Sequence, residues 1–379
     1  MTRLVLAALI LGLCCSSCKK EPNPTARLEH TERAFSLSGN QVANGLVSGF
    51  QSIYILGTST VGGSSRAIIL KLDENADLLW TKEIGNQSKG NGIICTNDDK
   101  LLLIGSEEDE VGNQDVFLAK LDDEGQTVWE RTFGGPLADQ GRDVIELDNG
   151  DLMIIGTTQS FGAGVADMYV IKTDSDGNEI WSRTFGGVGL DGGSELIQTS
   201  SFQVMLLGFT ESFGAGNRDI YLQGVSTDGD SLASFFYGGA DYEESQGIAE
   251  TWDGSYVMSN HSASEEPNHS LLATKLDVNG NILWETHFGT TTEHEGGESV
   301  LSDYDGNHIF LGRTNSFGND EQVYFVKTDA DGNLLEELNF GGMGDQRGND
   351  IIETPKAYLI TGTSMVNGGS DVLFVVHPK

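Results

Sequence analysis

Short stretches of alternating apolar and polar residues follow one another along the chain after its first thirty residues. In one clear unit they cover residues 142–147, 151–156, 167–172 and 179–185. Their β-branched and aromatic content is typical of strands, and the mature chain has no convincing helical period. Turns rich in Asp, Asn and Gly join the first stretch to the second and the third to the fourth, as tight hairpins require. The pattern therefore predicts four-stranded antiparallel sheets.

The four-stranded unit repeats. An aromatic-Gly-Gly motif, degenerate in some copies, marks each unit, and its seven anchors are residues 39, 85, 134, 186, 238, 289 and 341. Their spacing of roughly 50 residues matches one four-stranded blade of a β-propeller. The repeat thus predicts seven blades.

The two ends of the repeated region complement each other. The last unit stops after a third strand at residues 371–377, and residues 33–38 form an orphan strand before the first anchor. Pairing these strands completes the last blade and removes the exposed edges of an open array. We therefore predict an all-β fold over residues 33–379, a seven-bladed β-propeller closed by pairing its N-terminal strand into the last blade.

The pattern Asp-x-x-Gly-x-x-x-Trp-x-x-x-Phe-Gly-Gly resembles the tryptophan-docking repeats of quinoprotein-type propellers, which include the outer-membrane assembly lipoprotein BamB. Its positions are Trp80, Trp129, Trp181 and Trp284, with Ala233 and Glu336 breaking the pattern in the fourth and sixth units. The whole repeat, with its Ser-Phe-Gly-x-Gly-x-x-Asp loop, is similar to propeller lipoproteins of Bacteroidetes-type bacteria. This resemblance implies the fold and a binding or scaffolding role, and it supplies no cofactor pocket.

The N-terminus has the features of a targeting segment. Arg3 precedes an apolar stretch that is too short to span a bilayer and runs into a Cys-rich sequence. Its small residues before Cys18 resemble a bacterial lipobox, which implies a signal peptide over residues 1–18, a palmitate-bearing lipid anchor on Cys18 and a tether over residues 19–32. Lipidation at Cys15 and an ordinary cleaved signal peptide remain alternatives. Lys19 is not the Asp that retains lipoproteins in an inner membrane, so we expect the outer membrane, facing the periplasm or the cell surface.

The composition restricts the classes of partner that we expect. A formal net charge of −35 disfavours nucleic acid, because phosphate contacts need Lys and Arg. The acidic surface also keeps an exported domain soluble. We expect a monomer that meets a membrane only through its lipid anchor.

The topology predicts one face with longer loops, and such loops are where function usually lies. There, Phe161, Phe213 and Phe317 are candidates to contact a ligand; the alternative is that they pack between blades. The acidic candidates on the blade-to-blade connections, for a cation or a basic partner, are Asp139, Asp191, Glu243, Glu293, Glu295 and Asp345. For these the alternative is hydrogen bonding to turn backbone.

The fifth and sixth units depart from the repeat, with His294 between Glu293 and Glu295. The spacing matches no metal motif, so no metal or other cofactor is expected. The chain contains no nucleophile elbow, P-loop or dinucleotide fingerprint. The leading hypothesis is a non-catalytic, membrane-anchored binding or scaffold protein that engages a protein or glycan through the long-loop face. The alternative is a glycan hydrolase or lyase that uses carboxylates and His of the fifth and sixth blades.

Overall fold

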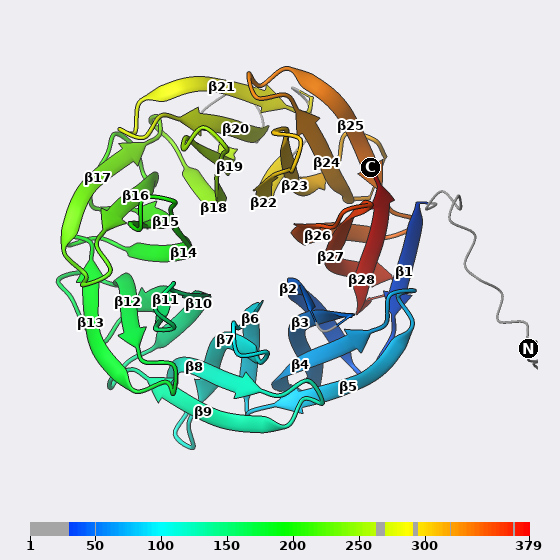
Figure 1. Ribbon diagram of the computed structural model, residues 1–379, viewed down its shortest axis with the longest axis horizontal. Coiled ribbons are helices and arrows are strands. Elements are labelled where there is room, and N and C mark those ends of the chain that lie inside the picture. Colours follow the sequence, from blue (N-terminus) through cyan, green and yellow to red (C-terminus); the bar gives the residue numbers. More distant parts are fainter. Residues whose placement is uncertain (1–29, 50, 263–269, 291–294, 319, 367) are drawn as a thin grey trace, which may run out of the picture.

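The computed structural model describes residues 30–379 except 50, 263–269, 291–294, 319 and 367. Within that part, strands β1 to β28 form seven four-stranded sheets. The sheets stand around a central channel as the blades of a propeller (Figure 1). The all-β, seven-bladed prediction is confirmed.

Each of the first four blades uses consecutive strands, from the channel to the rim. Blade one holds β2 (Asn40–Gly49), β3 (Ser52–Val61), β4 (Ser64–Leu72) and β5 (Leu78–Ile84). Blade two holds β6 (Ser88–Cys95), β7 (Leu101–Glu108), β8 (Gln114–Leu121) and β9 (Thr127–Phe133). Blade three holds β10 (Asp139–Glu146), β11 (Leu152–Thr158), β12 (Asp167–Thr173) and β13 (Glu179–Phe185). Blade four holds β14 (Asp191–Gln198), β15 (Val204–Thr210), β16 (Asp219–Val225) and β17 (Ser231–Tyr237).

The remaining blades follow the same order until the chain ends. Blade five holds β18 (Glu243–Glu250), β19 (Tyr256–Ser262), β20 (Ser270–Leu276) and β21 (Ile282–Phe288). Blade six holds β22 (Glu295–Ser302), β23 (His308–Thr314), β24 (Gln322–Thr328) and β25 (Leu334–Phe340). Blade seven holds β26 (Asp345–Glu353), β27 (Ala357–Val366), β28 (Gly369–Pro378) and the N-terminal strand β1 (Thr31–Phe35).

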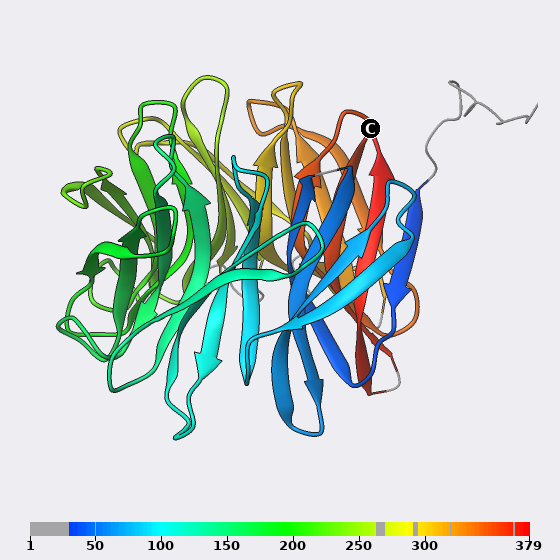
Figure 2. The ribbon, with the colours of Figure 1, turned by 60° about the horizontal axis from the view of Figure 1, so that its bottom comes forward.

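Closure works as the sequence predicts. Strand β1 pairs antiparallel with β28, from Thr31 opposite Val376 to Phe35 opposite Val372, and the two strands lie side by side in Figure 2. The strand begins at Thr31, two residues before the predicted start of the propeller. The hydrogen-bonded partner for the edge of β28 therefore comes from the opposite end of the chain.

Apolar side chains fill the spaces between neighbouring blades. Between blades two and three, for example, Leu118 and Ile104 belong to one cluster with Ile154 and Ile171, all nearly inaccessible to solvent. Comparable clusters join the other neighbours, so each interface between two blades has its own hydrophobic core. No helix in this part of the chain is long and apolar enough to cross a membrane.

The rim is held by a docking contact that repeats from blade to blade. The Asp174 carboxylate accepts the backbone N–H groups of Asp176 and Asn178, which fixes the β12–β13 turn. Gly177 in that turn has a φ of +77°, and a Cβ there would lie within 3.0 Å of the Trp129 ring of the preceding blade. Trp80, Trp181 and Trp284 meet Gly125, Gly229 and Gly332 in the same way. The geometry of the hairpin thus explains the repeated Asp and Gly, and packing between blades explains the repeated Trp.

The two breaks in the docking pattern have local explanations. In blade four, Phe235 reaches the turn glycine Gly280 from two residues beyond Ala233. In blade six, Glu336 lies 3.6 Å from the His377 imidazole in β28. Blade seven has no hairpin between its last two strands, because they come from opposite chain ends, so no turn glycine exists there for a Trp to cover.

Candidate functional site at the channel mouth

Every innermost strand carries a β-bulge at the same place. In blade three, Gly141 pairs with Gly156 and Asp143 pairs with Ile155, which leaves Arg142 unpaired between them. A Cβ on Gly156 would lie only 1.9 Å from the carbonyl oxygen of Gln140, so this close approach requires glycine. Glycine also occupies this position in five other second strands, at Gly57, Gly105, Gly208, Gly312 and Gly362, whereas blade five keeps the bulge with Asn260 there.

The bulged residues form a ring around the channel. They are Asn44, Asn91, Arg142, Ser194, Gln246, Glu298 and Asn349. All seven line one cavity of about 590 Å³. Met365 and Ser370 also line it, and these residues flank the β27–β28 connection, so the cavity opens on the long-loop face. Its size is that of a small-ligand site.

Three consecutive blades present the same amide arrangement to this cavity. The Nδ2 group of Asn349 donates to Ala43 O at 2.5 Å, that of Asn44 to Gly90 O at 2.7 Å, and that of Asn91 to Gly141 O at 2.6 Å. Each bond crosses to the next blade and fixes the amide orientation. Each Oδ1 atom, which has no protein partner within the described residues, is therefore left as an acceptor.

The charged residues of the ring differ in how they are partnered. Glu298 meets Arg313 at 3.1 Å, and Glu321 contacts both Arg313 and Arg347. Burial raises the pKa of Glu298, and the two nearby guanidinium groups oppose that rise. Arg142 makes no ion pair or side-chain hydrogen bond with any residue that the structure describes, and it is exposed. The cavity thus contains one unneutralised cation.

Three acidic side chains lie directly behind the ring. They accept backbone N–H groups of the next blade: Asp143 from Leu196 at 3.2 Å, Glu195 from Ile248 at 2.6 Å, and Asp350 from Leu46 at 2.7 Å. Burial without a neighbouring cation raises the pKa of Asp143 to about 6 and that of Asp350 to about 7. Burial and the charge of Asp143 also raise the pKa of Glu195 well above its usual range.

Most of the acids proposed from sequence for the connections cap turns. The buried Asp139 carboxylate accepts Gly135 N–H and Ser160 Oγ–H, both at 2.7 Å, and so fixes the aromatic-Gly-Gly turn. Asp191 and Glu243 bind their own Gly-Gly turns in the same way, and Glu295 binds the hydroxyl groups of Thr314 and Ser316. These contacts match the alternative of hydrogen bonding within the turns.

Asp345, the remaining acidic candidate among the described residues, does not bind the aromatic-Gly-Gly turn of its blade. Asp345 is exposed and accepts the backbone N–H of Glu321 at 3.0 Å. The buried capping position of blade seven belongs to its neighbour Gln346. Glu293 and His294 fall outside the described residues, as does Cys18.

The three loop phenylalanines are partly exposed. Phe161, Phe213 and Phe317 have exposed fractions of 44%, 41% and 49%, and each packs against a tyrosine of its own blade. The Phe161 and Tyr169 rings, for instance, are 5.6 Å apart. None of the three lines the central cavity. They belong to the same face but to a separate surface.

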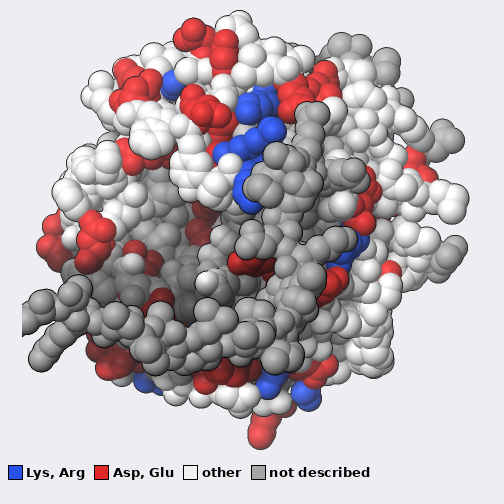
Figure 3. Space-filling view, turned by 45° about the vertical axis from the view of Figure 1, so that its right-hand side comes forward, with Lys and Arg blue, Asp and Glu red and all other residues white. Residues whose placement is uncertain are grey.

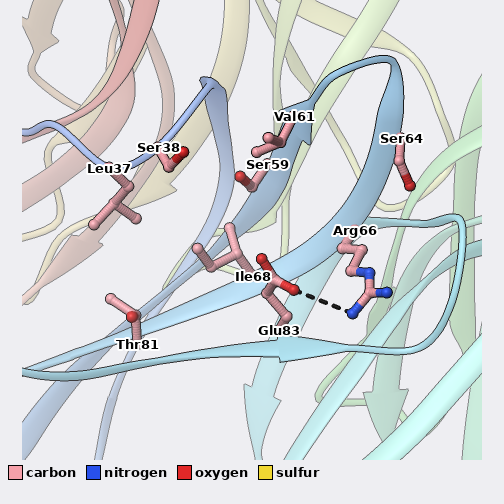
Figure 4. A pocket seen from close by; sticks show the side chains of 9 residues that line it. All are labelled: Leu37, Ser38, Ser59, Val61, Ser64, Arg66, Ile68, Thr81 and Glu83. Carbon is pink, nitrogen blue, oxygen red and sulfur yellow. Dashed lines mark hydrogen bonds and ion pairs between the residues drawn. The ribbon is translucent and has the colours of Figure 1, made fainter.

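Blade one lacks this aromatic pair and has a groove in its place. Ile68 stands opposite Gly57 in the sheet, as Tyr169 stands opposite Gly156. The groove has a volume of about 630 Å³, and the Arg66–Glu83 ion pair crosses it at 3.2 Å (Figure 4). Leu37 and Ile68 form part of its wall.

Acidic side chains are spread over the molecule, whereas basic ones occupy few places on the side drawn in Figure 3. Within the described ranges, no group of three or more His, Cys, Asp or Glu side chains is placed to hold a metal ion. Among the described arginines, Arg142 alone has neither an ion pair nor a side-chain hydrogen bond, whereas Arg131 and Arg183 donate to backbone carbonyls.

Comparisons with known proteins support the architecture. No protein-family model and no curated protein matches the sequence. Among solved structures, virginiamycin B lyase from Staphylococcus aureus superposes with a TM-score of 0.60 at 12% identity, covering 92% of this chain and 99% of the lyase. A polysaccharide lyase described as an ulvan lyase gives a TM-score of 0.63 at 10% identity, covering 91% and 96%.

A puromycin hydrolase structure gives a TM-score of 0.58 at 11% identity, covering 88% of this chain and 51% of the hydrolase. At these identities the likeness shows the fold alone. The chain is therefore a seven-bladed β-propeller whose structural neighbours include lyases and a hydrolase.

Proposed function

We propose that the protein is a non-catalytic binding or scaffold protein that engages a glycan or protein partner through its long-loop face. The observation that carries this proposal is the cavity at the channel mouth. At the bulge position the blades differ, with amides, a hydroxyl, a guanidinium and a carboxylate, while the surrounding turns and docking contacts repeat. A repeated backbone bulge that presents different side chains to one cavity is suited to ligand recognition.

The partly exposed Phe161, Phe213 and Phe317 add apolar contact area on the same face. Aromatic side chains are common anchors at both glycan and protein interfaces. In this proposal they form a second set of contacts, separate from the cavity.

The test is binding of the purified protein to an array of glycans and to extracted envelope proteins. Replacing Gln246 with Trp fills part of the cavity with a bulky side chain, and we expect it to abolish binding. Trp252→Ser removes a side chain that is 74% exposed in the β18–β19 hairpin, on the opposite face, and should leave binding unchanged. Loss of binding in the Trp252 variant alone would place the interaction on the hairpin face and overturn the proposal.

Lipid anchoring at Cys18 and an outer-membrane location form part of the same proposal. Metabolic labelling with a fatty acid should mark the parent chain and the Cys15→Ala variant but not Cys18→Ala. Labelling that survives Cys18→Ala and disappears in Cys15→Ala would move the anchor. Protease treatment of whole cells then distinguishes a surface from a periplasmic orientation.

One observation favours the enzymatic alternative. On blades four and five, Tyr242 receives a hydrogen bond from Arg218 at 2.7 Å and donates one to Glu244 at 2.7 Å. Burial and, after it, the neighbouring Glu244 carboxylate raise the pKa of Tyr242 to about 12. This network is specific to its blades, as a catalytic group would be. Turnover of any glycan by the parent protein that Tyr242→Phe abolishes would establish the alternative.

A further inference from the structure

The channel-mouth cavity indicates the chemical class of its ligand. We propose that it binds a sugar unit bearing an anionic substituent, either a carboxylate or a sulfate ester, with Arg142 as the residue that contacts the anion. This inference rests on the proposed function, because it requires that the cavity is the binding site.

The first argument is the state of Arg142. It lies on the cavity wall at the bulge of β10 and makes no side-chain contact to a described acidic group, whereas Arg313 and Arg347 are both paired with carboxylates. A guanidinium provides several N–H donors in a planar fork that matches a carboxylate or sulfate. Arg142 can therefore bind an anion without first breaking an ion pair within the protein.

The second argument is the order of groups around the ring. Asn349, Asn44 and Asn91 occupy blades seven, one and two, and Arg142 follows on blade three. The three amide Nδ2 groups are held by neighbouring carbonyls, which leaves three Oδ1 acceptors in a row beside one cation. Sugar hydroxyl groups donate to such acceptors while an anionic substituent meets the guanidinium.

The third argument is Thr363, on the wall of the same cavity. This residue is 3% exposed, and its Oγ1 atom has no hydrogen-bond partner among the described residues. Buried hydroxyl groups are normally paired, and an unpaired one costs free energy until a ligand or water satisfies it. It adds a polar contact on the side of blade seven.

The lining also favours a sugar over a protein segment. Only Val42 and Met365 among the lining residues are apolar, and no aromatic side chain is present. Protein hot spots need desolvated apolar or aromatic pockets, which this cavity does not offer. An acidic peptide is therefore the competing outcome of the test.

The experiment is calorimetric titration of the purified protein with short oligogalacturonates, with the same oligosaccharides after reduction of their carboxylates to alcohols, with sulfated oligosaccharides and with oligoglutamate. Short probes are used because a net charge of −35 repels long polyanions. We expect at least one anionic sugar to bind and its uncharged counterpart to bind about tenfold or more weakly. The carboxylated and sulfated arms identify the anion.

The variants locate the site. Arg142→Gln should weaken anionic-sugar binding by about tenfold or more. Arg183→Gln removes the same charge from β13 on the rim, where its guanidinium stacks over Trp181, and should leave binding unchanged. Both variants should melt within a few degrees of the parent.

The possible results distinguish a failure of the anionic-sugar inference from a failure of the proposed function. If neutral glycans bind as tightly as anionic ones, or Arg142→Gln binds as tightly as the parent, the anionic-sugar inference is wrong while the proposed function survives. If only oligoglutamate binds, the inference is also wrong and a protein partner is indicated. If no glycan or envelope protein binds at all, both the inference and the proposed function fail.

Discussion

The side-chain contacts at the rim of this propeller repeat from blade to blade, whereas the side chains at the channel mouth differ. At the rim, the same ring-on-glycine contact recurs at Trp80, Trp129, Trp181 and Trp284. The turn beneath it is fixed by an Asp in three cases and by Ser226 in the fourth. At the mouth, the backbone bulge recurs but its side chain changes from blade to blade. Repetition at the rim follows from the need to join blades. We attribute the variation at the mouth to ligand recognition, in line with the proposed function.

The largest effect is expected from a substitution that disturbs the β-bulge, because the bulge places the ring of side chains around the channel. Gly156→Ala places a Cβ 1.9 Å from the Gln140 carbonyl oxygen, which is a backbone atom of the paired strand β10. The bulge must shift to relieve this contact, so we expect a loss of about 3 kcal/mol or more in the free energy of unfolding. Chemical denaturation measures it.

Gly150→Ala provides the matched control. Gly150 has positive φ, but a Cβ added there would meet no atom within 4 Å, so only backbone strain is added. It should cost about 1 kcal/mol. Equal losses in the two variants would contradict the close-approach explanation of the bulge.

The next effect tests the rim. Trp129→Ala removes the ring that covers Gly177 and that carries the Arg131 guanidinium 5.2 Å from its centre. Because Trp129 is only half-buried, we expect a loss of about 2 kcal/mol in stability. Ligand affinity, measured below the melting transition, should not change. A fall in affinity with unchanged stability would reverse the roles given to rim and mouth.

The acids behind the ring give a pH-dependent prediction. The folded pKa of Asp350 is about 7, far above its ordinary value, so the folded state binds more protons than the unfolded one between about pH 4 and pH 7. Its contribution to stability is therefore lost as pH rises through that window. Asp350→Asn should be more stable than the parent by about 1 kcal/mol at about pH 8.

At about pH 5 the advantage of Asp350→Asn should vanish or reverse, because the parent carboxyl is then protonated. Asp371→Asn is the control, since this carboxylate is only partly buried on β28 and accepts Ser36 Oγ–H at 2.7 Å. Thermal melts across this pH range measure both. A pH-independent difference for Asp350→Asn would contradict the raised pKa.

The fold was predictable from sequence because its causes are local and repeated. The alternating pattern predicts strands, the Asp-Gly turns predict hairpins, and the missing fourth strand of the last unit predicts the closure. Each local signal occurs in several of the seven units, which strengthens the prediction. The Trp-on-Gly contact likewise joins two motifs that the repeat displays.

The candidate site was only partly predictable. The cavity opens on the long-loop face that the sequence singles out. Arg142 and the amide ring are not among the residues that the sequence indicates, because their position depends on a one-residue register shift. A glycine inside the second strand of a unit, such as Gly156, could have indicated the bulge, since a glycine inside a strand often marks one. Asp345 was chosen from its spacing, whereas the neighbouring Gln346 occupies the buried position.

The comparison between rim and mouth is tested most directly by measuring stability and affinity in one pair of variants, Trp129→Ala and Arg142→Gln. We predict that Trp129→Ala lowers the melting temperature and keeps the affinity for the anionic sugar. Arg142→Gln should keep the melting temperature and lose about tenfold or more in affinity. Unchanged affinity in Arg142→Gln, or loss of both properties together in either variant, would contradict the account.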